Sequence, residues 1–85
     1  MNLSDEIFIK DNHFIKEANF RSMVEKSIKN NKQNKIITVE VDNLNQLKQI
    51  KDLKINRVLF DNMNPALIAK GLTLLPKTVE TEASG

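Results

Sequence analysis

Four short apolar runs alternate with three longer amphipathic segments along the 85 residues of this chain. The runs lie at residues 6–10, 35–41, 57–60 and 78–83. The first three are continuous and rich in branched or aromatic residues, which is typical of strands covered on both faces. The fourth is interrupted by Glu80 and Thr81. The pattern predicts four strands.

The segments between the runs have helical spacing. Apolar residues recur at every fourth position over residues 20–28 and at every third over residues 44–53, after two residues that can cap a helix. In the third segment Asn64 is a good N-cap, and Pro65 fits the first helical position. Pro76 ends this helix, and Gly71 either weakens it or allows close packing.

Strands that alternate with helices of this length imply right-handed βαβ units and a parallel sheet. We therefore predict an α/β fold over residues 1–85, a parallel βαβαβαβ segment of an incomplete, TIM-like barrel with helices on one side. A complete barrel takes ~250 residues, so this length supplies roughly a third of one. We expect Ile37, Val39 and Leu59 to line the inner face of the barrel.

Composition excludes several classes of function. The net charge of +2, spread without an aromatic platform, argues against nucleic acid, and the lysines of residues 26–35 indicate a solvated loop. No run approaches the ~18 apolar residues of a membrane span, and the N-terminus has no signal-peptide pattern. The absence of cysteine fits a reducing compartment. We expect a cytoplasmic protein that binds neither nucleic acid nor membrane.

Polar residues follow each predicted strand. The carboxyl ends of parallel strands meet at one rim, where such folds bind ligands. This rim would gather Lys10 to His13, Glu40 with Asp42, Asp61 with Asn62, and Glu82 with Ser84 and Gly85. Paired carboxylates favour Mg²⁺, a Ser-Gly turn offers donors to a phosphate, and a lysine binds anions. The set indicates a site for a phosphorylated sugar or a nucleotide.

Simpler explanations exist for the same residues. Asp61 and Asn62 are ordinary turn residues, and this explanation is as well supported as ligand binding. A solvated residue at a strand end is the commoner outcome for Lys10, and a turn or packing role is the commoner one for His13. Glu40 stands apart, because a charge between two valines of a buried strand needs a partner.

Four ordered motifs resemble those of the quinolinate phosphoribosyltransferase family. They are KDNH (10–13), TVEVDNLNQL (38–47), LFDNM (59–63) and TEASG (81–85), and the resemblance covers essentially the whole chain. It implies a glycosyltransferase of NAD biosynthesis that converts quinolinate and phosphoribosyl pyrophosphate to nicotinate mononucleotide, pyrophosphate and CO₂ with Mg²⁺. It also implies an α/β sandwich domain beside an incomplete α/β barrel, and a dimer.

The resemblance assigns roles by position. Lys10 matches a lysine that lies against the substrates, and Glu40 and Asp61 match acids of the pyrophosphate, metal and ribose region. Ser84 and Gly85 match the start of the turn that holds the 5-phosphate. The catalytic set would be Lys10, Glu40 and Asp61, with Mg²⁺ on the two acids.

The arginines that bind quinolinate in this family lie on segments that would precede Met1. This chain has only Arg21, expected in a helix, and Arg57, expected at a strand start away from the rim. We therefore expect an internal barrel segment, without the sandwich domain and the other barrel strands, that is inactive alone and forms a homo-oligomer or joins a complementing chain. The alternatives are a segment of the molybdenum-transport-associated relative and a non-enzymatic remnant.

Overall fold

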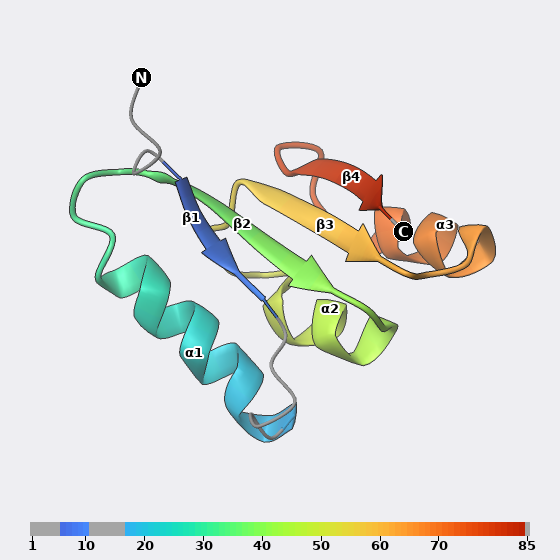
Figure 1. The fold of residues 1–85 in the computed structure, drawn as a ribbon, viewed down its shortest axis with the longest axis horizontal. Helices are drawn as coiled ribbons and strands as arrows, with labels where there is room; N and C mark the ends of the chain where they lie inside the picture. Colours follow the sequence, from blue (N-terminus) through green and yellow to red (C-terminus); the bar gives the residue numbers. More distant parts are fainter. Residues whose placement is uncertain (1–5, 11–16, 85) are drawn as a thin grey trace.

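A computed structural model describes residues 6–10 and 17–84 as one four-stranded sheet with three helices (Figure 1). The strands are parallel and stand in chain order, β1-β2-β3-β4. In chain order the elements are β1 (Glu6–Ile9), α1 (Glu17–Lys29), β2 (Ile36–Val41), α2 (Leu44–Ile50), β3 (Arg57–Asp61), α3 (Pro65–Leu74) and β4 (Glu80–Ser84). The predicted α/β fold and its parallel βαβαβαβ order are confirmed.

The helices α2 and α3 begin where the sequence places their caps. The Asn43 side chain accepts a hydrogen bond of 2.8 Å from the backbone N–H of Gln46, and Asn64 accepts one of 2.9 Å from Leu67. Pro65 occupies the first turn of α3, where its missing N–H has no helical partner to lose. These contacts determine the residues at which α2 and α3 begin after the preceding strands.

One face of the sheet is covered by the three helices and holds the core. Alternate strand residues point to this face, and they are fully buried in the two central strands: Ile37, Val39, Val41, Val58 and Phe60. Phe20, Val24, Leu47 and Ile50 of α1 and α2 complete the same cluster. Because side chains alternate along a strand, the residues between these buried positions point to the other face of the sheet.

Gly71 brings α3 close to the sheet. A Cβ at this position would lie 2.9 Å from Leu47 Cδ2 and 3.0 Å from Phe60 Cε1. Both neighbours are fully buried, so neither has room to move aside. Of the two roles predicted for Gly71, close packing is the one observed.

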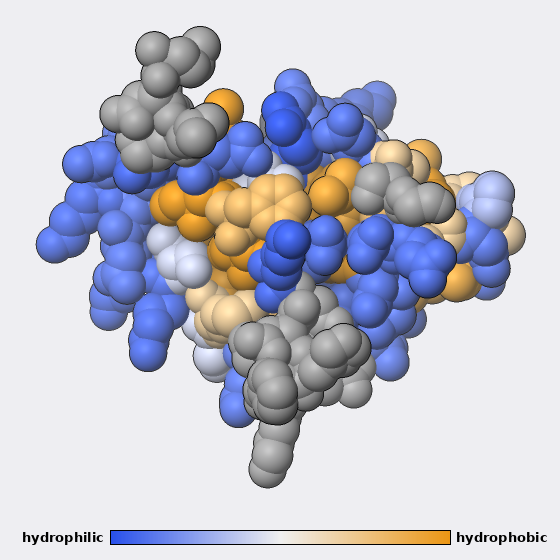
Figure 2. Space-filling model, in the orientation of Figure 1, coloured by the Kyte–Doolittle hydropathy of each residue, from blue (hydrophilic) through white to orange (hydrophobic). Residues whose placement is uncertain are grey.

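The other face of the sheet, hereafter the open face, has no helix over it in the described part of the chain. Its residues follow the register of the strands: Glu6, Phe8, Ile36, Thr38, Glu40, Arg57, Leu59, Asp61, Glu80 and Glu82. Phe8 and Ile36 are each 44% exposed, and Figure 2 shows an apolar patch over the strands with hydrophilic side chains around it. The open face is thus apolar at its centre and charged at its borders.

This parity corrects part of the sequence prediction. Leu59 lies on the open face as expected, but Ile37 and Val39 are 2% and 0% exposed and lie among the core residues beneath the helices. The reason is the alternation of side chains along a strand, since Glu40 lies on the open face and its neighbours must point the other way. None of the helices in the described ranges is long and apolar enough to cross a membrane.

Candidate functional site

The carboxyl ends of β1, β2 and β3 bring three predicted site residues to one edge of the open face, hereafter the rim. Ile9 of β1 pairs with Val39 of β2. Lys10 follows Ile9 and Glu40 follows Val39, so Lys10 and Glu40 are neighbours on adjacent segments. Asp61 is the last residue of β3 and lies two positions beyond Leu59, the partner of Glu40. The rim therefore gathers one cation and two carboxylates from segments far apart in sequence.

The positions of Glu40 and Asp61 on neighbouring strands suit a shared ligand. Strands lie ~4.8 Å apart and two residues rise ~6.6 Å, so the Cα atoms of Glu40 and Asp61 are about 8 Å apart. Both side chains are half-buried, and both point to the same face. Two carboxylates so placed are able to approach one cation from two sides.

Glu40 has no ion pair within the part of the chain that the structure describes. The sequence argument for a partner rested on burial between Val39 and Val41, and those valines point to the core while Glu40 points away. The half-buried carboxylate is therefore accessible from the open face, and a metal or a ligand cation is not required to offset burial in the core.

Asp61 and Asn62 have different positions at the end of β3. Asn62 has a φ of 56°, the left-handed conformation that asparagine tolerates, and it turns the chain. Asp61 stays in the strand, opposite Ser84 of β4. Asp42, also expected near the rim, follows the last residue of β2 and accepts a 3.0 Å hydrogen bond from the Asn43 side chain at the start of α2.

The remaining predicted rim residues are placed only in part. Ser84 ends β4 and its backbone pairs with Asp61 at the rim. Gly85 and the stretch from Asp11 to His13 lie outside the described residues. Glu82 lies on the open face two residues before Ser84, opposite Leu59 of β3, and it is exposed.

Lys10 has a contact that the sequence analysis did not foresee. Its ammonium nitrogen lies over the ring of Phe8, 5.6 Å from the ring centroid. Phe8 and Lys10 are two positions apart, so both belong to the open face. The sequence signal for this contact is the alternation of side chains along a strand, which places Phe8 and Lys10 of EIFIK on the same face.

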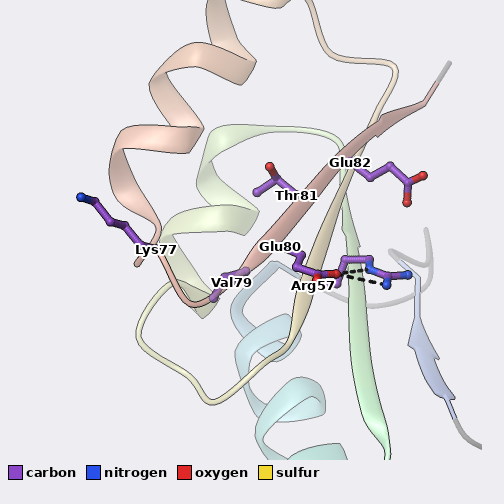
Figure 3. A pocket seen from close by; sticks show the side chains of 6 residues that line it. All are labelled: Arg57, Lys77, Val79, Glu80, Thr81 and Glu82. Atoms are coloured by element: carbon purple, nitrogen blue, oxygen red, sulfur yellow. Dashed lines mark hydrogen bonds and ion pairs between the residues drawn. The ribbon is translucent and has the colours of Figure 1, made fainter.

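A hollow lies at the opposite end of the sheet, beside the free edge of β4 (Figure 3). It is lined by Arg57, Lys77, Val79, Glu80, Thr81 and Glu82. Arg57 Nη2 lies 3.2 Å from Glu80 Oε2, and Figure 3 shows these two side chains turned toward each other while Lys77 points away. Its ion pair joins Arg57 to Glu80 at the start of β3 and β4, whereas Lys10, Glu40 and Asp61 lie at the carboxyl ends of the strands, and we therefore place the candidate site at the rim.

Neither arginine of the chain reaches the rim, as predicted. Arg57 starts β3 at the far end of the open face, and Arg21 lies in α1. Arg21 holds Asp52 with hydrogen bonds of 2.6 and 3.1 Å and also donates to the Gln49 carbonyl at 2.7 Å. This contact holds the pKa of the Asp52 carboxyl below its usual value, chiefly through the hydrogen bond from Arg21, and raises the pKa of Arg21.

The open face also contains a polar contact between two strands that sequence reasoning missed. Thr38 is 2% exposed, and its hydroxyl donates a 3.1 Å hydrogen bond to Glu6 on the neighbouring strand. The described residues include no group of three or more His, Asp or Glu side chains arranged for a metal. Metal binding at the rim would therefore rest on two carboxylates and on atoms of a ligand.

Comparisons with known proteins agree on one family. The model of the quinolinate phosphoribosyl transferase C-terminal domain matches residues 1–85. The solved structure of NadC from Streptococcus pyogenes is 27% identical to this chain, with a TM-score of 0.83. The alignment covers 99% of this chain and 30% of the NadC chain. Nicotinate-nucleotide pyrophosphorylase from Ehrlichia chaffeensis is 29% identical with a TM-score of 0.76 and the same coverage. No curated protein matches, and the chain spans about 30% of the length of these solved structures.

Proposed function

Since the chain belongs to the family of the quinolinate phosphoribosyl transferase C-terminal domain, we propose that it forms the phosphate- and metal-binding part of such an enzyme in NAD biosynthesis. The reaction would join quinolinate to phosphoribosyl pyrophosphate and release pyrophosphate and CO₂, giving nicotinate mononucleotide. The observation that carries the proposal is the meeting of Lys10, Glu40 and Asp61 on one face at the ends of adjacent strands. We place the reaction in the cytoplasm.

Lys10 supplies the positive charge of the rim. Its ammonium group would face the pyrophosphate of the substrate, whose negative charge grows as the bond to the ribose breaks. A fixed cation that meets developing charge stabilises the transition state more than the ground state. Lys10 is exposed and forms no ion pair with Glu40, so it is available for an anionic ligand.

Glu40 and Asp61 would hold Mg²⁺. The fit rests on the donor set, because Mg²⁺ is usually bound by one or two carboxylates together with substrate phosphates. The estimated Cα separation of about 8 Å lets both side chains reach one ion. When bound, Mg²⁺ would neutralise charge on the pyrophosphate. Ser84 and Gly85, which follow from the next strand, would contribute to binding the 5-phosphate.

The quinolinate half of the site needs more cations than the rim offers. Two carboxylates of the substrate would require partners, and the chain's two arginines are held by Asp52 and Glu80 away from the rim. We propose that a complementing chain supplies those groups, since a second copy of this chain would bring the same two paired arginines. The chain by itself would bind phosphoribosyl pyrophosphate and leave quinolinate unreacted.

Calorimetric titration of the 85-residue chain with phosphoribosyl pyrophosphate and Mg²⁺ tests the proposal. We expect binding that requires Mg²⁺. Glu40→Gln and Asp61→Asn keep the shape of each side chain and remove its charge, and each should weaken Mg²⁺-dependent binding on the order of 10-fold or more, as loss of a charged contact does.

Glu25→Gln is the matched control, because Glu25 is an exposed carboxylate on α1 away from the open face. It should bind as the unsubstituted chain does. Equal affinity in all four proteins, or no binding in any, would refute the proposed role of the rim.

A further inference from the structure

The contact between Lys10 and Phe8 has a feature that an ion pair lacks. Glu40 is the nearest carboxylate on the adjacent strand, yet no ion pair joins it to Lys10 in the described ranges. The ammonium group lies instead over the neutral ring of Phe8, at 5.6 Å from its centroid. A ring orients a cation without neutralising it.

The ring is well placed for this task. Phe8 precedes Lys10 by two positions on the same face, and its neighbour across the sheet is Thr38. The lysine side chain therefore folds back over the open face, on which Glu40 and Asp61 also lie, rather than extending past the end of the strand. At 44% exposure Phe8 contributes little to the core, and its burial alone does not explain an aromatic residue here.

We propose that Phe8 is a positioning residue that holds the Lys10 ammonium over the open face, ready for an anionic ligand while Glu40 stays free for a cation. The inference rests on the proposed function, which assigns the anion to the pyrophosphate group. A free lysine side chain has high rotamer entropy. A contact that already restricts Lys10 before binding reduces the conformational entropy that is lost when the ligand binds. The ring acts through Lys10 and touches no reacting atom.

Two measurements test the proposal. The first is the ring-current shift of the Lys10 ε-methylene protons in NMR spectra, which a ring beneath the side chain moves upfield. We expect the shift in the unsubstituted chain and in Phe8→Tyr, and its loss in Phe8→Leu. An ordinary Lys10 resonance in the unsubstituted chain would overturn the proposal.

The second is the affinity for inorganic pyrophosphate with Mg²⁺ in a double-mutant cycle. Phe8→Leu should weaken binding about two- to fivefold, as expected from an exposed cation–π contact, and Phe8→Tyr should restore it. In a Lys10→Met background Phe8→Leu should have no further effect. An unchanged affinity, or an equal loss in both backgrounds, would refute positioning through Lys10.

The two measurements separate this inference from the proposed function. If the unsubstituted chain fails to bind pyrophosphate, the proposed function fails, and the ring-current shift then decides whether Phe8 holds Lys10. If pyrophosphate binds and the shift is missing, the function stands and the inference is wrong. Each variant keeps a large side chain at position 8, and a thermal melt of each confirms that the fold is kept.

Discussion

Gly71→Ala sets two known effects against each other, and the structure decides which prevails. Alanine in place of glycine within a helix is favourable by about 1 kcal/mol, because glycine loses more backbone entropy on folding. The added methyl group, however, would lie 2.9 Å from Leu47 Cδ2 and 3.0 to 3.2 Å from the Phe60 ring. Overpacking of this kind costs about 1–3 kcal/mol.

The burial of Leu47 and Phe60 determines whether Gly71→Ala raises or lowers the free energy of unfolding. Leu47 is 0% exposed and Phe60 is 1% exposed, so both are held by the core and neither can turn toward solvent. We expect a net loss of up to about 2 kcal/mol, and ~1 kcal/mol shifts the melting temperature of a domain this small by about 4–8 °C. Urea unfolding followed by circular dichroism, at matched protein concentration, measures the change in the free energy of unfolding.

Leu47→Val provides the matched background. It removes the Cδ atoms that the new methyl group would meet first, so Gly71→Ala should cost less there than in the unsubstituted chain. If Gly71→Ala raises stability by the full ~1 kcal/mol of helix propensity, α3 does not pack on the sheet as described, and the reasoning from close approach is wrong.

Three further outcomes follow from the same contacts. Arg21 lowers the pKa of the Asp52 carboxyl in the folded chain. The pair therefore stabilises the fold fully above the unfolded-state pKa of about 3.9, and this stability is lost as the pH falls through the lower folded-state pKa. Asp52→Asn should flatten that part of an acid-unfolding curve. The outer edges of β1 and β4 and the apolar centre of the open face should make the chain self-associate. Sedimentation should show species heavier than one chain, and a single species with the mass of one chain would contradict this. The purified chain should not turn over quinolinate, because both arginines are engaged away from the rim; turnover free of host enzyme would show that other groups hold the dicarboxylate.

The order of elements was predictable from the sequence because each boundary has a local cause. Asn64 and Pro65 mark the start of α3 through one hydrogen bond and one missing donor, and both effects are local in the chain. The fourth strand was less sharply defined: the prediction of residues 78–83 became Glu80–Ser84. Its charged residues alternate on the open face, and an edge strand tolerates them.

The faces of the strands were harder to assign than the strands themselves. A continuous apolar run such as that around Ile37 and Val39 does not say which parity is covered, and only the charge of Glu40 indicates it. Close packing at Gly71 could be predicted only as one of two alternatives, because it depends on how α3 lies against Phe60 of β3 and Leu47 of α2. For the site, strand ends were enough to bring Lys10, Glu40 and Asp61 together, and the ring beneath Lys10 needed the alternation within β1.

Paramagnetic broadening by Mn²⁺ in the presence of pyrophosphate tests the central claim most directly, since Mn²⁺ binds the same oxygen ligands as Mg²⁺. In a spectrum of backbone amides, a cation held at the rim broadens signals of Glu40, Val41 and Asp61 first. The competing acids are Glu80 and Glu82, which line the hollow beside β4. The account predicts early broadening at the ends of β2 and β3, with loss of that pattern in Asp61→Asn. Broadening that begins at Glu80 and Glu82 and is unchanged in Asp61→Asn would contradict it.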